Sequence, residues 1–404
     1  MSGSGGGVGP LAAAAAVRAG GRTPVELVEK ALAAAEALDP VLHFAESLDP
    51  AGALAAARRV SPELPLAGVP FLIKSGTAAG SPVVTRLVAA GAIPIGVSTR
   101  NRPGTDSQTH GWNGTDYTRN PWDLTRSPGG SSAGAAAAVA AGVVPLATGG
   151  DSGGSLRIPA AFCGVTGFKG SAGRVPRPGR PLIGLAVSGL IGADLDDVVT
   201  ATSLISGPER CDPSASPFWP VPVTEPGRRL RVAFLTSFGR GTADSAVAAV
   251  VRDRIAAGMS LEGPAGLDLV GVVLDLAAPE DAWDTLAALD AGRGVSGDQV
   301  RHATELRRAA DRALADVFDT VDAIVTPTTL TVAHPYDGPV TSDFVGDLCW
   351  DFNITGHPAV SVPAGLAEGL PVGLQVVAGH GRDDVAVTVA RLLRVTLPPP
   401  PVSA

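Results

Sequence analysis

The stretch from residue 127 to 159, SPGGSSAGAAAAVAAGVVPLATGGDSGGSLRIP, constrains the fold more than any other part of the chain. It holds two clusters of glycine and serine, at residues 129–132 and 149–155, separated by an alanine-rich run from 133 to 141. That run predicts a buried helix, and residues 143–148 predict a short buried strand that an internal proline weakens. A loop, a helix, a strand and a second loop can bring the two serine clusters together. Glycine at this density lets the backbone approach a ligand and turn its N–H groups toward it.

The rest of the chain alternates between predicted helices and predicted strands. Thr23 and Glu26 form a capping-box sequence that begins a helix reaching to about Leu38. Further helices are expected at about 81–91, 194–205, 244–257, 280–291, 298–318 and 383–395, and strands at about 65–73, 93–97, 230–235, 267–274, 321–326 and 372–377. This alternation predicts an α/β layered fold with a largely parallel or mixed sheet. Residues 100–122 are polar and predict a long loop that carries His110.

The glycine- and serine-rich stretch resembles the signature block of the amidase signature family. Its second cluster reads Asp151-x-Gly153-Gly154-Ser155-Leu156-Arg157-Ile158-Pro159. The flanking segments that also resemble the family are Gly68–Lys74, Asn120–Asp123, Phe162–Lys169, Asn353–Pro363 and Gly369–Gln375. The resemblance covers roughly residues 23 to 393 and is weakest between about 206 and 319. It implies a single α/β/α sandwich domain around a large mixed β-sheet.

The domain organisation follows from the extent of that resemblance. We expect a flexible N-terminal tail over residues 1–10 and a proline-rich tail over residues 397–404. Between them lies the family domain, residues 11–396. Within that domain we expect a catalytic core at about 64–200 and a more variable region at about 206–319.

The resemblance also implies a reaction and the residues that carry it. An amide is a poor electrophile, so its hydrolysis needs an activated nucleophile and a trap for the oxyanion. By resemblance, Ser155 is the nucleophile, Ser131 is a relay held by a cis peptide bond, and Lys74 is the base. The oxyanion hole would be formed by the backbone N–H groups of Ser152, Gly153, Gly154 and Ser155. Lys74 follows an apolar run with no acidic neighbour in sequence, a setting in which burial lowers the pKa of lysine.

Other residues near the block have less specific expected roles. Asp151 and Arg157 are expected to be structural partners. Substrate contacts are expected from Gly129, Gly130, His110 and Trp350. Each motif also has a structural interpretation: a serine before a helix can cap it, an isolated Gly-Gly-Ser is more often a tight turn, and a lone lysine usually extends to the surface. The six histidines stand in unrelated contexts, and none is marked as a general base.

Composition argues against several classes of partner. The net charge is −8 and the chain has no basic tract, which argues against nucleic-acid binding. No apolar run is long enough to span a bilayer, and the first residues lack the pattern of a secretion signal. Cys163, Cys211 and Cys349 have no metal-ligand spacing and indicate a reducing compartment. We therefore expect a cytoplasmic enzyme that acts on a small-molecule amide without a metal or organic cofactor; a homodimer is plausible from the resemblance.

Three other functions stay open. The chain could be an amidotransferase-type amidase subunit that supplies ammonia within a complex. It could be a serine esterase using Ser132, because residues 130–134 match G-x-S-x-G, although that motif needs a strand directly before it and residues 123–129 are a polar loop. It could also be a catalytically altered family member with a binding or acyl-transfer role. Compared with the family pattern, Ser75 replaces an aspartate and the segment after Lys74 is short, which bears on pocket shape more than on catalysis.

Overall fold

One sheet runs through the whole molecule. The computed structural model describes residues 9–101, 110–177, 185–216, 227–336 and 346–403. In these ranges eleven strands pair into a single sheet. In spatial order they are β1 (Ala45–Leu48), β3 (Ile93–Ser98), β2 (Pro70–Lys74), β4 (Leu146–Asp151), β6 (Val187–Gly192), β5 (Thr166–Lys169), β10 (Ala359–Ala367), β11 (Leu370–Ala378), β9 (Ala323–Pro327), β7 (Leu230–Phe234) and β8 (Leu267–Leu269). Strand β2 is parallel to β3 and β4, and β7 is parallel to β8 and β9, whereas the remaining pairs are antiparallel. The expected mixed sheet is confirmed.

Helices cover both faces of the sheet, because strand residues alternate between two apolar cores. In β2, Phe71 belongs to one core and Leu72 to the other, and in β11 Val376 and Val377 divide in the same way. The first face carries α1 (Pro10–Arg18), α4 (Pro82–Ala89), α7 (Leu195–Ile205), α8 (Ser245–Met259) and α12 (Asp383–Leu393). The second face carries α2 (Pro24–Leu42), α3 (Pro50–Ala57), α5 (Ala133–Ala140), α6 (Arg157–Cys163), α10 (Gly297–Phe318) and α11 (Asp347–Ile354). The result is the three-layer α/β/α sandwich that the resemblance implied.

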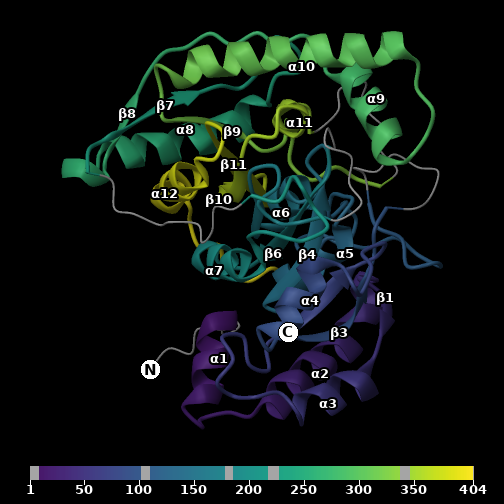
Figure 1. The fold of residues 1–404 in the computed structure, drawn as a ribbon. Helices are drawn as coiled ribbons and strands as arrows, with labels where there is room; N and C mark the ends of the chain where they lie inside the picture. Colours follow the sequence, from purple (N-terminus) through teal and green to yellow (C-terminus); the bar gives the residue numbers. More distant parts are fainter. Residues whose placement is uncertain (1–8, 102–109, 178–184, 217–226, 337–345, 404) are drawn as a thin grey trace.

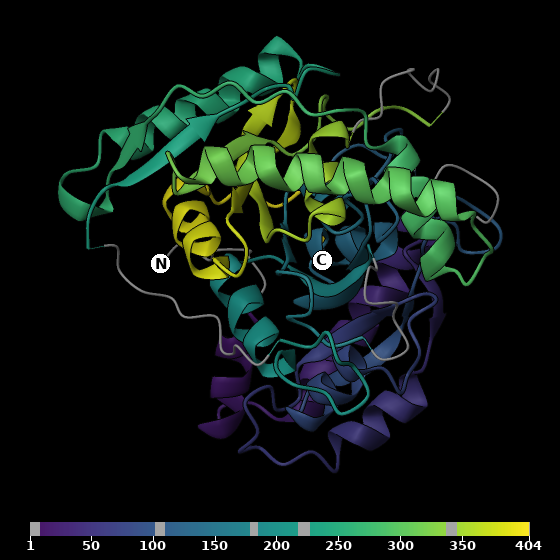
Figure 2. The ribbon, with the colours of Figure 1, turned by 45° about the horizontal axis from the view of Figure 1, so that its top comes forward.

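The order of the strands places early and late parts of the chain at opposite ends of the sheet. Figure 1 shows β1 and the purple helices at the bottom, and β7 and β8 with the green helix α10 at the top. Helix α9 (Glu280–Asp290) packs beside α10 at one end of that helix. In the turned view of Figure 2, α10 lies lengthwise over the yellow strands near the C-terminal part of the chain. The glycine- and serine-rich stretch occupies the middle of the sheet.

Several predicted elements are confirmed, and others need correction. Thr23 and Glu26 form the predicted reciprocal capping box of α2. Pro10, assigned to a flexible tail, is instead the buried first residue of α1. The strand expected at 143–148 begins only after Pro145, since proline cannot donate to a ladder, and runs on to Asp151. The strand expected at 267–274 ends at Leu269.

The C-terminal segment folds back onto the other end of the molecule. Val402 donates its N–H to the carbonyl of Pro121 at 3.2 Å and packs against the core beneath α2 and α5. Figure 1 accordingly places the C-terminus over the blue part of the chain. The proline-rich tail is therefore docked over the residues that the structure describes.

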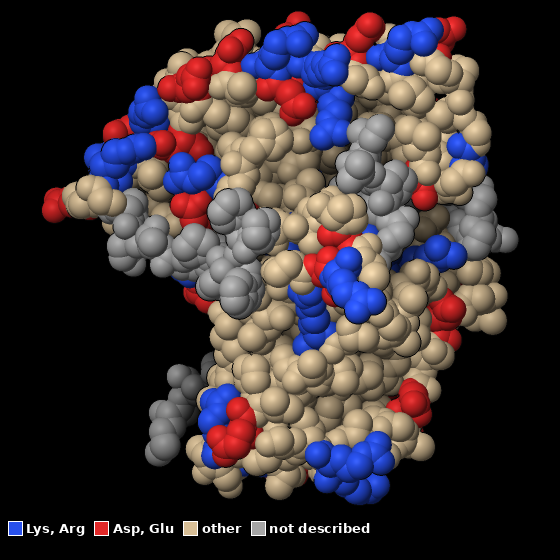
Figure 3. All heavy atoms as spheres, in the orientation of Figure 1, with Lys and Arg blue, Asp and Glu red and all other residues tan. Residues whose placement is uncertain are grey.

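The length of the helices and the distribution of surface charge bear on membrane and nucleic-acid partners. Among the described residues, no helix has both the length and the apolar character needed to cross a bilayer. On the face drawn in Figure 3, blue basic and red acidic side chains are interspersed and do not gather in one basic field. The expected absence of a nucleic-acid partner stays a prediction.

Candidate active site

The candidate site lies at one edge of the sheet, where β2 and β4 end. These two strands are parallel, so their carboxyl ends meet at the same edge. Lys74 is the last residue of β2 and Asp151 is the last residue of β4. Helix α5 leads back into β4, and its N-terminal end therefore lies at this edge, directly after Ser131 and Ser132. The fold thus brings together the lysine strand and both glycine–serine clusters.

Lys74 is buried and contacts the predicted relay serine. Its side chain is 8% exposed, and its Nζ lies 2.8 Å from Ser131 Oγ and 3.3 Å from the carbonyl oxygen of Gly150. Burial lowers the pKa of Lys74 to about 7; the charge of Asp151 opposes this, and Arg100 and Arg177 add to it. A lysine with this pKa exists partly as the neutral amine at neutral pH and can accept a proton.

Ser131 and Ser155 come from the two clusters and meet at this edge. The peptide bond between Gly130 and Ser131 is cis, as the resemblance implied. Ser132 donates its backbone N–H to the carbonyl of Ser155 at 3.3 Å, which ties the two clusters together. Among the described residues the hydroxyls of Ser131 and Ser155 make no hydrogen bond to each other. The lysine–serine half of the predicted relay is therefore formed, and the serine–serine half is not.

Ser132 does not have the setting of a nucleophile. Its side chain is fully buried, and its Oγ has no hydrogen-bond partner within the part of the chain that the structure describes. Residues 121–131 contain turns and no strand, whereas the G-x-S-x-G motif needs a strand directly before it and an exposed serine hydroxyl. The structure contradicts the esterase alternative at this position.

Asp151 and Arg157 form a fully buried ion pair beneath Ser155. Arg157 Nη2 lies 2.9 Å from Asp151 Oδ1, and its Nε lies 2.9 Å from Oδ2. Arg157 also donates to Gln375 and Asn353 at 2.6 Å each, and to the carbonyl of Cys349 at 3.2 Å. Burial alone would raise the pKa of Asp151, but Arg157 and Lys169 hold it well below its usual range. The pair therefore stays ionised, which fits the expected structural role.

The Asp151 carboxylate accepts a hydrogen bond from one of the N–H groups predicted to form the oxyanion hole. Asp151 Oδ1 accepts the N–H of Gly154 at 2.7 Å, and Oδ2 accepts that of Leu156 at 3.2 Å. The N–H of Gly154 is thus already donated within the protein, which corrects the expectation that it faces the substrate. The backbone N–H groups of Ser152, Gly153 and Ser155 remain as candidates.

The four residues expected to contact substrate have different surroundings in the structure. Gly129, with φ of 78°, packs on α6, since an added Cβ would lie 2.9 Å from Pro159 Cα, so packing explains this glycine. Gly130 precedes the cis bond. The structure places His110 in an aromatic cluster, with its ring 4.3 Å from Tyr117. Trp350 lies beside Gly153, since a Cβ added there would lie 3.2 Å from its Cδ1 and Nε1.

Sequence reasoning missed four residues around the site. Thr148 Oγ1 accepts the N–H of Lys74 at 2.9 Å and fixes the end of β2. Asn353 and Gln375 stand in segments that resemble the family, and their polar character inside apolar segments was an available signal. Trp283, from α9, donates its Nε1–H to the carbonyl of Ser152 at 2.6 Å. Nothing in the sequence around Trp283 marks that contact.

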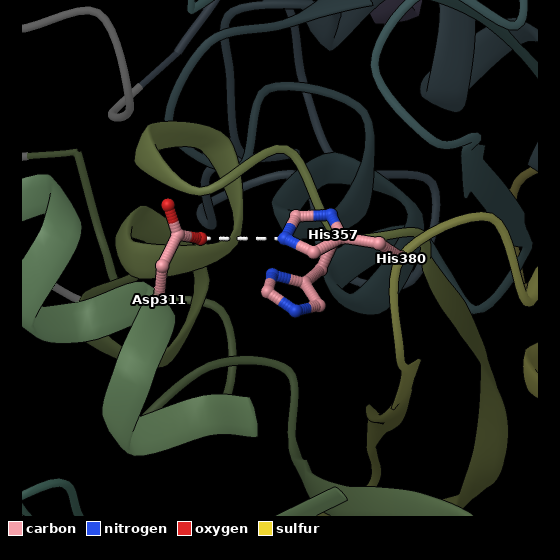
Figure 4. Close-up of side chains that lie close together, drawn as sticks. All are labelled: Asp311, His357 and His380. Atoms are coloured by element: carbon pink, nitrogen blue, oxygen red, sulfur yellow. Dashed lines mark hydrogen bonds and ion pairs between the residues drawn. The ribbon is translucent and has the colours of Figure 1, made fainter. Parts of the chain in front are cut away.

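A second cluster of titratable side chains stabilises the packing of α10. Figure 4 shows Asp311 of α10 facing His357 and His380, whose ligand atoms all lie within 4.8 Å of one another. His380 Nε2 pairs with Asp311 Oδ1 at 3.3 Å, and the two imidazole rings stack with centres 3.7 Å apart. Two imidazoles on one tetrahedral zinc have ring centres roughly 5 Å apart, so this stack would have to open to hold a metal.

The hydrogen bonds of His357 fix its tautomer. Thr355 donates its hydroxyl to the carbonyl of Asp351 at 2.7 Å, so its oxygen can only accept from His357 Nδ1, 2.8 Å away. Burial, together with His380 and Lys169, keeps the pKa of His357 far below its usual value. The ring is therefore neutral and serves as a packing element between α10 and the sheet.

Comparisons with known proteins identify a family and a shared fold. The family model described as Amidase matches residues 76–263 and 285–387, a range that includes Ser131 and Ser155 and begins just after Lys74. A glutamyl-tRNA(Gln) amidotransferase subunit from Chloroflexus aurantiacus is 32% identical, covering 95% of this chain and 94% of that protein. Its alignment runs over 469 positions, whereas this chain has 404 residues, so this chain lacks some of the relative's segments.

Two solved structures are similar along nearly their whole length. The 6-aminohexanoate cyclic dimer hydrolase has a TM-score of 0.82 and 26% identity, covering 98% of this chain and 99% of that one. The corresponding glutamyl-tRNA(Gln) amidotransferase subunit from Thermotoga maritima has a TM-score of 0.78 and 25% identity, covering 94% and 95%. The fold is thus shared with enzymes whose names point to different substrates.

Proposed function

The chain belongs to the amidase family, an enzyme family, and on that premise we propose that it hydrolyses a small, non-peptide carboxylic amide through an acyl-enzyme on Ser155. Neutral Lys74 accepts a proton from Ser131, and Ser131 accepts one from Ser155 as its Oγ attacks the amide carbonyl carbon. The protons return through the same relay to the leaving nitrogen when the carbon–nitrogen bond breaks. Water then attacks the acyl-enzyme, and the carboxylic acid leaves.

The observation that carries this proposal is the 2.8 Å contact between Lys74 Nζ and Ser131 Oγ in a buried setting. A lysine with an ordinary pKa would hold its proton at neutral pH and could not act as a base. Burial lowers the pKa of Lys74 to about 7, close to the operating pH at which a general base is most effective. The lysine pairs with a hydroxyl and not with a carboxylate, so its proton is free to leave.

The proposed relay needs one movement. The hydroxyls of Ser131 and Ser155 must come within hydrogen-bond distance of each other while Ser131 keeps its contact with Lys74. Catalytic hydrogen bonds are often long without substrate and tighten in the Michaelis complex. The backbone N–H groups of Ser152, Gly153 and Ser155 are the proposed oxyanion donors, with Gly154 excluded by its bond to Asp151.

The test is release of ammonia or amine from a panel of primary amides, anilides, cyclic amides and L-glutamine, for wild type, Ser155→Ala, Lys74→Ala and Ser132→Ala. We expect Ser155→Ala to abolish turnover and Lys74→Ala to lower kcat/KM by about 10²–10⁴-fold, the usual contribution of a general base. Ser132→Ala is the matched control, because it removes the neighbouring hydroxyl and should keep activity. A fluorophosphonate probe should label Ser155. Label on Ser132, or full activity in Lys74→Ala, would refute the proposal.

A second candidate is an amidotransferase-type subunit that supplies ammonia to a partner. It is favoured by the relatives at 32–34% identity, which are named as subunits of glutamyl-tRNA(Gln) amidotransferase. In that case L-glutamine should be the preferred substrate in the panel, and turnover should rise when partner subunits co-purify with the chain. A preference for other amides, at full activity in the isolated chain, supports the first candidate. Sedimentation of the same sample tests the expected homodimer.

A further inference from the structure

Trp283 links a distant helix to the backbone that leads into Ser155. It stands on α9, inside the region 206–319 where the family resemblance is weakest. Its Nε1–H donates to the carbonyl oxygen of Ser152 at 2.6 Å. Ser152 lies in the segment that carries the remaining oxyanion donors. A residue outside the glycine–serine clusters therefore controls part of their backbone.

The contact with the Ser152 carbonyl also fixes the direction of the Gly153 N–H, because both belong to one peptide group. A peptide group is planar, and in the trans form its C=O and N–H point in opposite directions. Among the described residues the one cis bond is Gly130–Ser131, so the Ser152–Gly153 bond is trans. When Trp283 holds the Ser152 carbonyl, it also fixes where the N–H of Gly153 points, which is away from the indole.

Two indoles prevent this peptide group from turning. Trp283 and Trp350 stack with ring centres 5.7 Å apart and planes 17° from parallel. A Cβ placed on Gly153 would lie 3.2 Å from Trp283 Nε1 and from the Cδ1 and Nε1 of Trp350. The tryptophan pair therefore covers one side of Gly153 closely.

The neighbouring peptide group is held in the same manner. Asn353 Nδ2 donates to the carbonyl of Asp151 at 2.9 Å, which fixes the N–H of Ser152. Gly154 donates its N–H to Asp151 and cannot bind an oxyanion. Three of the four expected donors remain, and the direction of the Gly153 N–H decides whether it can be one of them.

We propose that Trp283 is a positioning residue that aims the Gly153 N–H at the oxyanion formed on the Ser155 acyl carbon. The inference rests on the proposed function, because it assumes attack by Ser155. It gives α9 a part in the reaction, through one hydrogen bond to the carbonyl of Ser152.

The experiment compares Trp283→Phe with a matched variant, Trp122→Phe. Phenylalanine keeps an aromatic ring for the stack with Trp350 but removes the indole N–H. Trp122 also donates its Nε1–H to a backbone carbonyl, that of Cys163, at 2.9 Å, but Cys163 is the last residue of α6 and lies outside the oxyanion segment. Each change thus removes one indole–carbonyl hydrogen bond, and the two differ in which peptide group is released.

The probe is a small alkyl fluorophosphonate, whose second-order rate of labelling at Ser155 reports how well the site stabilises a developing oxyanion without requiring the natural substrate. Removing one oxyanion donor costs about 10²–10³-fold in rate, so misdirecting one should slow labelling by about tenfold or more. We expect that loss in Trp283→Phe and less than about twofold change in Trp122→Phe, with equal melting temperatures. For any amide turned over, kcat should fall while KM stays unchanged.

The possible results separate this inference from the proposed function. Wild-type labelling at Ser155 with an unchanged rate in Trp283→Phe would overturn the inference and leave the proposed function intact. Equal slowing in both variants would also overturn it, since the effect would then be general loosening. Absence of labelling at Ser155 in the wild type would refute the proposed function and the inference with it.

Discussion

Two buried charged groups lie at the same edge of the sheet and behave in opposite ways. Lys74 ends β2 with a hydroxyl and a carbonyl as its contacts, whereas Arg157 lies beneath Ser155 in a two-bond ion pair with Asp151. Burial lowers the pKa of Lys74 to about 7, and the Lys74 ammonium group can therefore lose its proton at neutral pH. Burial would also neutralise Asp151, but Arg157 keeps its pKa well below the usual range.

The difference shows that burial alone does not decide what a charged group does. A buried charge without a partner of opposite charge loses its charge and becomes an acid or base at neutral pH. A buried charge with a well-aligned partner keeps it and fixes the backbone around it. In the proposed mechanism the site has one group of each kind, Lys74 as the base and the Asp151–Arg157 pair as a scaffold. Three predictions test that division.

The largest expected effect is on the scaffold. Asp151→Asn keeps the shape but turns an NH₂ group toward the Arg157 guanidinium and leaves that cation buried without its partner. Breaking a buried pair in this way costs about 3–5 kcal/mol. Urea unfolding of the variant should show a loss of that order. Fluorophosphonate labelling of Ser155 should slow, because the new NH₂ group removes the acceptor of either the Gly154 or the Leu156 N–H.

Asp383→Asn is the control for that prediction. Asp383 pairs with Arg174 at 2.8 Å, and both side chains are buried. The other hydrogen bonds that Asp383 accepts come from the N–H and the hydroxyl of Ser171, which lies outside both serine clusters. This variant should also lose stability, while its folded fraction labels at the wild-type rate. A wild-type unfolding midpoint for Asp151→Asn would remove the distinction between scaffold and base.

The second prediction is a gain in stability, in contrast to the loss expected for Asp151→Asn. The folded-state pKa of Lys74 is depressed below its unfolded value of 10.5, so below that value the unfolded chain binds the proton more tightly and folding is penalised. Lys74→Met should therefore be inactive yet more stable than wild type, by on the order of 2 kcal/mol at pH 7. The gain should shrink as the pH rises toward about 10.5. Urea unfolding at pH 7 and pH 10 measures it, and a Lys74→Met protein less stable than wild type at pH 7 would contradict the prediction.

The smallest effect is in the pH profile. Below a pKa of about 7, Lys74 holds a proton and cannot accept another, so kcat/KM should fall about tenfold per pH unit on the acid side. Above it the profile should level off. Rates between pH 5.5 and 9, with Ser155 labelling measured alongside, test this; a flat profile across that range would mean that Lys74 is not the base.

Much of the fold could be predicted because its signals are local. The capping box at Thr23 and the alanine-rich run after Ser132 each depend on residues next to one another. The glycine-rich strand β6 and the short β5 gave weak periodic signals, and their pairing with β4 and β10 depends on residues far away in sequence. The boundaries expected at 64–200 and 206–319 stay predictions.

The site was predictable in its residue types but not in its hydrogen bonds. Resemblance and spacing indicated Lys74, Ser131 and Ser155, and the fold brings all three to one edge. The capture of the Gly154 N–H by Asp151 could not be foreseen, because a sequence does not show which donors a carboxylate accepts. The contact between Trp283 and Ser152 joins residues 131 positions apart, and no sequence motif at either residue predicts it.

The reach of Arg157 sets when the site can first exist during synthesis. The two acceptors at 2.6 Å, Asn353 and Gln375, follow it by 196 and 218 positions. A ribosome-bound chain that already contains Lys74, Ser131 and Ser155 can still lack Asn353 and Gln375. Arg157 then has no partners for these two hydrogen bonds. Contacts of such high sequence separation form late, after the cost of closing a long loop has been met. A growing chain therefore carries all three proposed catalytic side chains well before it can hold them in working order.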